Sequence, residues 1–429
     1  MSIPLHSDKP RGNLYIHGIG QLVTMAGPVR RGREAMNDIG LIPGPATLVI
    51  EDGVITYAGT EKGAPARHGF APEEVIDAGG NCVLPGFVDS HTHLVFGGYR
   101  EDEFQWRLAG ESYMSIMERG GGIASTTRAT REASCDELYR KSRAHLDDFL
   151  TMGVTTVESK SGYGLDKETE IRQLEVAERL DREHPIDLYR TYMGAHDLSP
   201  EFRDRGFSAY TDFIIREMLP LVKERGLASA VDVFTEKGVF ELEDSRRLLS
   251  AAKEMGFKVK MHADEIYPLG GARLAAECGC LSADHLLKIS EEGIAKLAHS
   301  DTVATCLPLT AFSLRDNYAP ARRMIDEGCA VALASDLNPG SCFSSSVPLM
   351  IALATIYMGM TVEEALTALT INGAAAIDST SAIGSLEAGK KGDAVILRYP
   401  GYKFLSYHFG VNLVRTTIKA GKVVYDYFV

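Results

Sequence analysis

The sequence lacks the cysteine spacing of a disulfide framework or a zinc ribbon. Its seven cysteines, at positions 82, 135, 278, 280, 306, 329 and 342, form an odd set without a C-x-x-C pair. Such a set is more typical of reduced thiols in the cytosol than of a disulfide-bonded secreted domain. Cys278 and Cys280 lie two residues apart, but without a second cysteine pair this spacing is only a weak indication of a metal site.

Basic clusters and long apolar runs are also missing. The formal net charge is -13, whereas nucleic-acid-binding proteins display a basic surface, so we expect no nucleic-acid partner. Residues 1–13 lack the apolar core of a secretory signal, and the most apolar stretch, residues 347–360, is too short and interrupted to span a membrane. These absences predict a cytoplasmic protein without a membrane partner.

Both ends of the chain contain short β-rich runs separated by turn residues. These runs are residues 46–50 and 54–58 near the start, and 394–397, 411–419 and 422–425 near the end. Glu51-Asp52-Gly53 and Ala420-Gly421 stand at the turns of two predicted hairpins. We therefore predict that residues 1–80 and 381–429 fold together as a small β-sandwich domain, with a catalytic domain of residues 81–380 inserted between them.

In the middle of the chain, short apolar runs alternate with helical patterns, which is typical of βα units and a parallel sheet. Eight runs are candidate strands: residues 83–90, 155–159, 187–193, 230–234, 258–262, 282–285, 302–306 and 330–335. Capping boxes at residues 134–137 and 361–364 predict two helix starts. Eight parallel strands predict an α/β fold with a closed (β/α)8 barrel of the TIM type.

Candidate metal ligands follow several of these strands. In Asp89-Ser90-His91-Thr92-His93, the two histidines can face the same side, although H-x-H by itself is equally consistent with two ordinary histidines. His262, His285 and Asp336 stand at or just after the ends of the fifth, sixth and eighth candidate strands. Because the carboxyl ends of barrel strands meet around one mouth, we predict that these side chains converge on a metal.

These residues belong to motifs that resemble the amidohydrolase superfamily over nearly the whole chain. The motifs are residues 84–93, His262, His285, Asp336, residues 384–386, Gly389 and residues 392–394. Within the superfamily, the loops resemble the imidazolonepropionase family, in residues 95–101, 119–123, 160–165, 194–196, 262–265, 282–286 and 334–341. Residues 304–314 match the family pattern only loosely.

The resemblance implies hydrolysis of the cyclic amide of 4-imidazolone-5-propanoate to N-formimidoyl-L-glutamate, in histidine degradation, by a homodimer. It implies that one divalent metal, zinc or iron, is bound by His91, His93, His262 and Asp336. It also implies that a small-molecule substrate is surrounded by Arg100, Tyr163, His196, Glu265, Asn338, Gly340 and Ser341. Three histidines and a carboxylate suit zinc and also accept iron, so the sequence does not choose between them.

The chemistry of amide hydrolysis assigns roles to three of these residues. A divalent metal can activate a water and polarise the carbonyl. We expect Asp336 to accept a hydrogen bond from that water, His285 to stabilise the oxyanion or orient the water, and Glu265 to pass a proton to the leaving nitrogen. Taken by itself, Glu265 is better explained as a solvated loop glutamate.

Substrate recognition and the number of metals lead to two further expectations. Arg100 is suited to a two-point contact with the propionate, and Tyr163 and His196 would frame the ring. Lys160 invites comparison with the modified lysine that bridges two metals in related enzymes. It lies on the second candidate strand, away from the position of such a bridge, so we predict a single metal.

Two alternative functions stay open at this point. An amidohydrolase-type deaminase of a different heterocycle would share the metal, His285 and Asp336 but use different loops, and ammonia release would reveal it. A catalytically inactive scaffold could keep the barrel for assembly alone. Such proteins usually lose ligands, whereas this sequence retains all of them.

Overall fold

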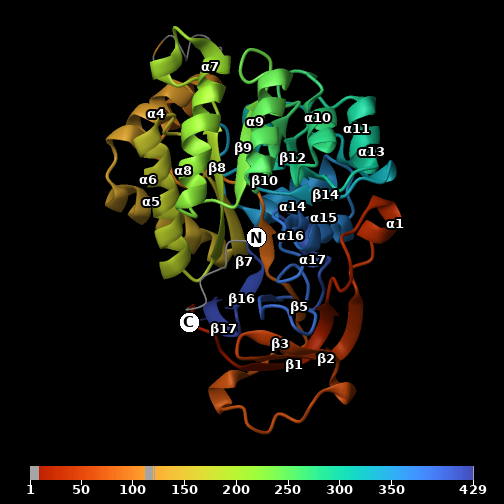
Figure 1. Ribbon diagram of the computed structural model, residues 1–429. Coiled ribbons are helices and arrows are strands. Elements are labelled where there is room, and N and C mark those ends of the chain that lie inside the picture. The colour runs from red at the N-terminus through yellow and green to blue at the C-terminus, as the bar shows by residue number, and fades with distance from the viewer. Residues whose placement is uncertain (1–8, 112–118, 120, 429) are drawn as a thin grey trace.

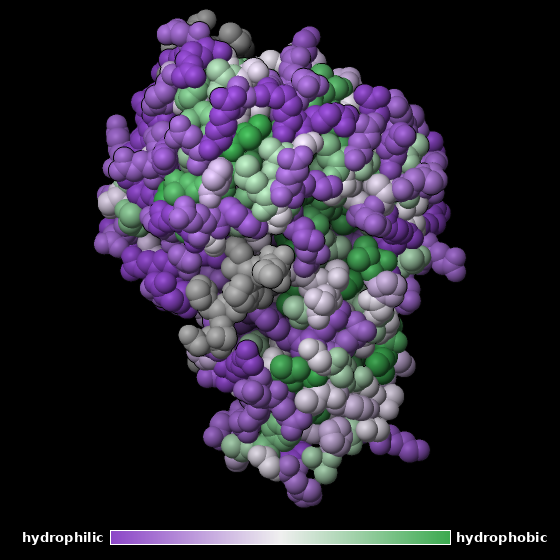
Figure 2. Space-filling view, viewed as in Figure 1, coloured by the Kyte–Doolittle hydropathy of each residue, from purple (hydrophilic) through white to green (hydrophobic). Residues whose placement is uncertain are grey.

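The computed structural model describes residues 9–111, 119 and 121–428. A barrel with surrounding helices fills the upper part of Figure 1, and a smaller sheet lies below it. Hydrophilic side chains cover most of the barrel on the face shown in Figure 2, and apolar ones occur there in small groups. In the described ranges, no helix has the length and apolar character needed to cross a membrane.

The barrel is a sheet of parallel strands. Its strands are β6 (Phe87–Asp89), β7 (Val154–Lys160), β8 (Asp187–Ala195), β9 (Ala230–Thr235), β11 (Met261–Ala263), β12 (Ser282–His285), β13 (Val303–Cys306) and β14 (Val331–Leu333). They pair in chain order, and the short β10 (Lys258–Val259) pairs with β9. The predicted α/β fold, with eight parallel strands and a smaller β-rich part, is therefore confirmed.

The first and last strands of this sheet are joined by the loops that follow them. Asp336 N donates to His91 O at 3.0 Å, and His93 N donates to Leu337 O at 2.9 Å. Thr92 and Leu337 form a parallel bridge between these two hydrogen bonds. The segments that carry the predicted metal ligands therefore also close the barrel at its mouth.

A ring of helices surrounds the barrel, and several of them follow their sequence signals. They are α4 (Ile123–Glu132), α5 (Cys135–Thr151), α6 (Lys167–Glu183), α7 (Gly206–Phe213), α8 (Leu219–Glu224), α9 (Leu242–Glu254), α10 (Gly271–Cys278), α11 (Glu291–Ala298), α13 (Ala321–Asp326), α14 (Val347–Ile356), α15 (Val362–Ala368) and α16 (Ile371–Ala375). Both predicted capping boxes are present, since Ser134 accepts from Glu137 N and Thr361 accepts from Glu364 N. The turn Ile214–Met218 joins α7 to α8.

Further helices lie outside this ring or within its loops. They are α1 (Gly32–Met36), α2 (Glu101–Leu108), α12 (Pro308–Leu314) and α17 (Phe404–Tyr407), with single turns at Glu61–Gly63, Pro72–Glu74 and Pro200–Phe202. Helices α2 and α12 follow β6 and β13 directly, so both stand at the barrel mouth. All seven cysteines are free thiols.

The smaller sheet takes strands from both ends of the chain. It contains β1 (Leu14–Val23), β2 (Leu41–Glu51), β3 (Val54–Thr60), β4 (Val75–Asp77), β5 (Cys82–Pro85), β15 (Ala394–Leu397), β16 (Val414–Lys419) and β17 (Lys422–Asp426). The predicted hairpins are β2–β3 and β16–β17, and their turn residues Asp52, Gly53, Ala420 and Gly421 all have positive φ. Alternate residues of β15 face two cores, one shared with the barrel and one within the sheet, as two-sided burial of a strand requires.

The predicted strand of residues 83–90 is two strands that belong to different sheets. Leu84 pairs with Val395 in the smaller sheet, whereas Phe87 pairs with Val154 in the barrel. The chain changes sheets at Gly86, where a Cβ atom would lie 2.3 Å from Thr155 Oγ1. The smaller sheet thus takes β5 from the segment, residues 81–380, that the predicted division gives to the barrel. Both strands are buried, so one apolar run could not reveal the change.

Candidate active site

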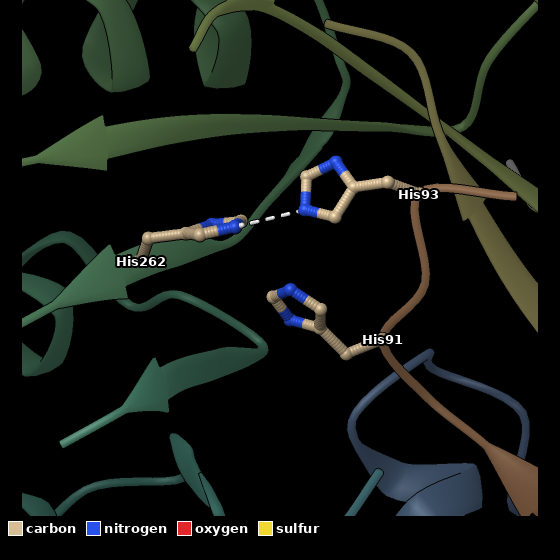
Figure 3. Close-up of side chains that lie close together, drawn as sticks. All are labelled: His91, His93 and His262. Atoms are coloured by element: carbon tan, nitrogen blue, oxygen red, sulfur yellow. Dashed lines mark hydrogen bonds between the residues drawn. The ribbon is translucent and has the colours of Figure 1, made fainter. Parts of the chain in front are cut away.

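Three histidines converge at the barrel mouth (Figure 3). His91 and His93 follow β6, and His262 lies on β11. The Nε2 atoms of His262 and His93 are 3.4 Å apart, and the ring centres of His91 and His262 are 4.5 Å apart. All three side chains are buried, and their ligand atoms are close enough together to hold one metal ion.

Two buried carboxylates orient these rings. His91 Nδ1 lies 2.6 Å from Asp284 Oδ2, and His262 Nδ1 lies 3.2 Å from Asp232 Oδ1. Since a carboxylate only accepts, each Nδ1 must donate, which leaves each Nε2 as a lone-pair donor facing the centre. His91 Nε2 is buried and has no hydrogen-bond partner among the described residues. A divalent cation would satisfy these nitrogens, so the residues present fit a metal.

Burial keeps the three imidazoles neutral. It is the largest influence that lowers the pKa of His91, His93 and His262 well below the usual value, and neighbouring cationic groups lower the pKa further. Neutral imidazole is the form that binds a metal. The electrostatics of the site therefore agree with its geometry.

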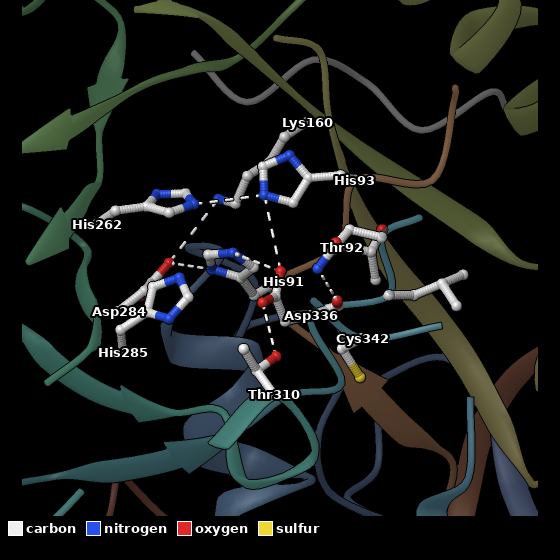
Figure 4. A network of polar contacts seen from close by, with 12 residues as sticks. His91, Thr92, His93, Lys160, His262, Asp284, His285, Thr310, Asp336 and Cys342 are labelled. Atoms are coloured by element: carbon white, nitrogen blue, oxygen red, sulfur yellow. Dashed lines mark hydrogen bonds and ion pairs between the residues drawn. The ribbon is translucent and has the colours of Figure 1, made fainter. Parts of the chain in front are cut away.

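Asp336 and His285 complete the centre. Asp336 Oδ1 lies 3.5 Å from His91 Nε2 and 3.7 Å from His93 Nε2, while its Oδ2 accepts from Thr310 Oγ1 at 2.7 Å (Figure 4). His91, His285 and Asp336 form a second group of potential ligands. Both Asp336 and His285 have positive φ, a conformation that L-residues seldom adopt.

A cavity of about 320 Å³ opens over this centre. Its lining includes all seven predicted substrate residues, Arg100, Tyr163, His196, Glu265, Asn338, Gly340 and Ser341. The structure thus brings together every residue that the sequence singled out for the site. Phe234, Ile266 and Leu287 add apolar surface to the same wall.

An aromatic wall stands beside the histidines. The ring of His196 stacks on His93 with the ring centres 4.9 Å apart and the planes at 16°. The ring centres of Tyr163 and His196 are 5.2 Å apart. His196 Nδ1 donates to Gly162 O at 2.9 Å, so its Nε2 is left for the cavity. Burial lowers the pKa of His196 to about 4 and raises the pKa of Tyr163. Both side chains are therefore neutral partners for a ring.

Asn338 shapes the loop after β14. Its Oδ1 accepts from the backbone N–H groups of Gly340 and Ser341 at 2.9 and 2.8 Å, and its Nδ2 donates to Asp336 O. The same Nδ2 donates to Ser341 Oγ at 2.8 Å. This side chain therefore fixes the loop that contains three of the predicted substrate residues.

Two arginines and one glutamate lie on one face of α2. Arg100 Nε donates to Glu103 Oε2 at 2.8 Å, and Arg107 Nη2 donates to Gly340 O at 3.2 Å. Glu103 also accepts from Gly122 N. Positions 100, 103 and 107 share a helix face because they are three and four residues apart. Two guanidinium groups against one carboxylate give this part of the cavity a net positive charge.

Glu265 stands at the cavity edge next to His285, with Oε1 3.5 Å from His285 Nδ1. Burial, followed by the charges of Asp336 and Glu236, raises the pKa of Glu265 to about 8. The carboxyl group is therefore protonated near neutral pH. Glu236 Oε2 accepts from Ile266 N at 2.9 Å and so anchors the loop that bears Glu265.

Lys160 lies below the metal centre and is held by carboxylates. Its Nζ is 2.6 Å from Asp232 Oδ2 and 2.8 Å from Glu158 Oε2. Burial lowers the pKa of Lys160, but Asp232 and Glu158 outweigh that effect and raise it above the usual value. An ammonium group in ion pairs offers no lone pair to a metal, so Lys160 is not placed to bridge two metals.

Sequence reasoning missed several residues that support the site. Asp232 could have been noticed as a charge inside an apolar strand, and Asp284 as the neighbour of His285. Thr310 lies in residues 304–314, which match the family pattern only loosely, and no local pattern singles out Arg107. Gly120, in the motif at residues 119–123, lies outside the described residues.

The chain is similar in sequence to a known protein family and to named proteins. A model of the amidohydrolase family matches residues 82–424. The chain is 66% identical to an imidazolonepropionase of Porphyromonas gingivalis, over 96% of this chain and 97% of the relative.

Solved structures with the same fold are far less similar in sequence. A 5-methylcytosine deaminase from Klebsiella pneumoniae is 17% identical with a TM-score of 0.71, and 97% of this chain and 99% of that chain are covered. An adenosine deaminase from Xanthomonas campestris with bound zinc is 17% identical with a TM-score of 0.69, covering 96% and 93%. At this identity the likeness shows the fold alone.

Proposed function

This chain belongs to the imidazolonepropionase family within the amidohydrolases, and on that premise we propose how its cavity works. The chain hydrolyses the cyclic amide of 4-imidazolone-5-propanoate to N-formimidoyl-L-glutamate, a step of histidine degradation. The relative at 66% identity is an imidazolonepropionase, whereas the deaminases at 17% identity share only the fold. The identity therefore favours this hydrolysis over a deaminase activity.

The proposed metal site consists of His91, His93, His262 and Asp336. The three histidines form one group of potential ligands, and Asp336 Oδ1 lies 3.5 and 3.7 Å from the Nε2 atoms of His91 and His93. Lys160 fills the carboxylate cluster beneath them, which favours a single ion. The donor set of three imidazoles and one carboxylate suits zinc and accepts iron. When bound, such an ion lowers the pKa of a water and polarises the amide carbonyl.

The residues around the centre would handle the protons. Asp336, held by Thr310, accepts a hydrogen bond from the attacking water, and His285 orients that water or stabilises the oxyanion. Glu265 is protonated near neutral pH and gives its proton to the ring nitrogen as the C–N bond breaks. His285 lies 3.5 Å from Glu265, so the water's proton can return to the carboxylate through this pair.

The guanidinium groups of Arg100 and Arg107 would receive the propionate. Arg100 offers the free edge of a guanidinium already fixed by Glu103, and Arg107 adds a second cation beside Gly340. Burial, followed by the charge of Arg100, lowers the pKa of Arg107. A single carboxylate is the complement of one excess positive charge. Tyr163 and His196 would frame the ring between this pair and the metal.

The observation with the greatest weight for this mechanism is that one cavity is lined by His93, His262 and Asp336, by an acid with a raised pKa and by two arginines. The test is to supply freshly made 4-imidazolone-5-propanoate and follow the loss of its ultraviolet absorbance while assaying ammonia. Loss of absorbance with N-formimidoyl-L-glutamate formed and no ammonia is the expected result. Ammonia release in step with substrate loss would point to deamination instead.

Two expectations about the whole protein remain predictions. They are a homodimeric state and a cytoplasmic location. Light scattering of the purified protein tests the first, with twice the 46.7 kDa mass of one chain as the expected value.

A further inference from the structure

The barrel interior beneath the metal centre is ionic. Glu158 and Lys160 on β7, Asp232 on β9, Asp284 on β12 and Lys260 before β11 are all at most 1% exposed. Branched apolar side chains usually fill this layer of a barrel, because buried charges are unfavourable unless they are closely paired. A cluster of five charges therefore calls for an explanation beyond stability.

Two of these carboxylates touch the metal-ligand candidates directly. Asp232 Oδ1 holds His262 Nδ1, and Asp284 Oδ2 holds His91 Nδ1. Both contacts occupy Nδ1 and so direct Nε2 to the metal position. The orientation of the two imidazoles depends on where these carboxylates point.

Lys160 is the cation that reaches both carboxylates. Its Nζ donates to Asp232 Oδ2 at 2.6 Å and lies 3.8 Å from Asp284 Oδ2, as Figure 4 shows for the second pair. Among the described residues, Lys160 provides the hydrogen bond to Asp232 Oδ2, the oxygen opposite the one that faces His262. Lys260 lies 3.8 Å from Asp284 and donates to Ser90 O and Ala376 O instead.

We propose that Lys160 is a positioning residue of the metal centre, which holds Asp232 and Asp284 in the orientation that presents Nε2 of His262 and His91 to the cation. This inference rests on the proposed metal site. With the ammonium in place, Asp232 has one oxygen fixed by Lys160 and the other directed at His262. Without it, Asp232 Oδ2 loses its donor, and the carboxylate is held only at Oδ1, which accepts from Val233 N at 2.7 Å.

The test is the zinc affinity of Lys160→Met, which keeps an unbranched side chain, one heavy atom shorter, and removes its charge. Zinc dissociation constants are measured on the full-length metal-free protein by competition with a chelating dye. Loss of a partner behind a metal ligand typically weakens binding by about 10- to 100-fold, and we expect a loss in that range. An unchanged zinc dissociation constant in Lys160→Met would overturn the proposal.

Lys419→Met is the matched control. Lys419 is also a buried ammonium with two carboxylate partners, Asp187 Oδ2 at 2.7 Å and Asp393 Oδ2 at 2.6 Å. Asp187 is the first residue of β8, so this cluster lies at the end of the barrel opposite the metal centre. Lys419→Met should lower the melting temperature of the metal-free protein and leave zinc affinity unchanged. An equal loss of zinc affinity in both variants would mean that any buried charge defect weakens the site, and would also overturn the proposal.

A second variant tests the proposal in case Lys160→Met folds poorly. In Lys160→Met/Glu158→Gln, one cation and one carboxylate are removed together, so the net charge of the cluster equals that of the wild type. Glu158 does not contact the metal-ligand candidates, since its oxygens meet Lys160 and Thr191. If Lys160 positions Asp232, the double variant folds and still binds zinc about 10-fold or more weakly. Wild-type zinc affinity in the double variant would mean that Lys160 only balances the charge of the carboxylates, and would overturn the proposal.

His262→Ala separates this inference from the metal site on which it rests. If the wild type binds zinc and His262→Ala does not, the ligand set is supported and the Lys160 variants decide the inference alone. If His262→Ala binds zinc as the wild type does, the proposed ligand set is wrong and the inference falls with it.

Discussion

Glu265, whose side chain is 16% exposed, and the buried Asp336 are two carboxyl groups of one cavity whose surroundings differ. Burial raises the pKa of both, to about 8 for Glu265 and about 7 for Asp336. Asp336 accepts from Thr310 and faces the Nε2 atoms of His91 and His93, so a bound cation would stabilise its ionised form. Glu265 lies beside His285, and Thr310 donates its hydrogen bond to Asp336 and not to Glu265. At the scale of single residues, the environment therefore assigns one group to the metal and the other to proton donation.

Replacing the Glu265 carboxyl by an amide tests this assignment. Glu265→Gln should reduce turnover by about 100-fold or more, because a general acid typically contributes that factor, while metal content stays unchanged. Steady-state kinetics and elemental analysis measure the two quantities. A turnover close to that of the wild type would transfer the proton step to His285 or Asp336.

The raised pKa of Glu265 also predicts a pH dependence of stability. The folded pKa of about 8 exceeds the value near 4.5 expected in the unfolded chain, so the folded state holds an extra proton between these values. Stability from this group is fully present below about pH 4.5 and is lost as the pH rises through 8. Metal-free Glu265→Gln should therefore gain roughly 2 to 4 kcal/mol relative to the wild type between pH 5 and pH 8.5. Thermal unfolding at both pH values measures this, and a constant difference between the two proteins would contradict it.

Arg100 should affect recognition more than chemistry. A charged hydrogen bond to a carboxylate contributes about 1.5 to 3 kcal/mol, so Arg100→Ala should lower kcat/KM by roughly 10- to 150-fold with unchanged metal content. Lys at this position should restore only part of the loss, because it lacks the planar two-point contact. The control is an imidazolone ring without the propionate, on which the substitution should have little effect. An equal loss of kcat/KM on both substrates would mean that Arg100 does not bind the propionate.

At the scale of elements, the loop after β14 and helix α2 form one substrate-binding unit. Gly340 lies against Arg100, its carbonyl oxygen accepts from Arg107, and its N–H donates to Asn338. A Cβ atom at Gly340 would lie 2.0 Å from Arg100 Nη1 and 2.6 Å from Arg100 Cζ. The absence of a side chain at this position is what allows the loop and the helix to meet.

Gly340→Ala should therefore behave as a weaker form of Arg100→Ala. The added methyl group displaces the guanidinium, and we expect KM for the propionate substrate to rise about 10-fold with metal content retained. Gly401→Ala is the control, since its nearest neighbour would be Gln21 Oε1 at 3.4 Å, an ordinary contact. Unchanged kinetics in Gly340→Ala would mean that Arg100 can move without loss of binding.

At the scale of the whole molecule, the metal centre joins parts of the barrel that are distant in the chain. Its proposed ligands follow β6, lie on β11 and follow β14, and the barrel closes through Asp336 N to His91 O. An ion at this position would link the first, fifth and last strands of the barrel. Removal of the ion would leave the buried Nε2 of His91 without a hydrogen-bond partner among the described residues, which is unfavourable.

Chelation of the metal should lower the melting temperature, and zinc should restore it. A ligand present at 1,000 times its dissociation constant stabilises the folded state by about 4 kcal/mol. Scanning calorimetry with and without zinc measures the shift, and His262→Ala should show almost none. Equal melting temperatures for the loaded and metal-free wild type would argue against a centre that links the strands.

The sequence by itself determined the elements and the residues that meet at the barrel mouth. The two hairpins, both capping boxes and the parallel barrel follow from patterns within ten to twenty residues, where turn chemistry and periodicity act directly. His91, His93, His262, His285 and Asp336 could be grouped because each stands at the end of a predicted strand and a closed barrel brings those ends together.

Only the tertiary structure decided what surrounds these residues. Asp284 lies 193 residues from His91, and Lys160 lies 72 residues from Asp232, so no local pattern pairs them. The same limit applies to Thr310 at Asp336 and to Arg107 at Gly340. It also applies to residues 83–90, which divide between two sheets although both strands are buried. A local pattern reports whether a side chain is buried, whereas its partner is chosen by the packing of elements far apart in the chain.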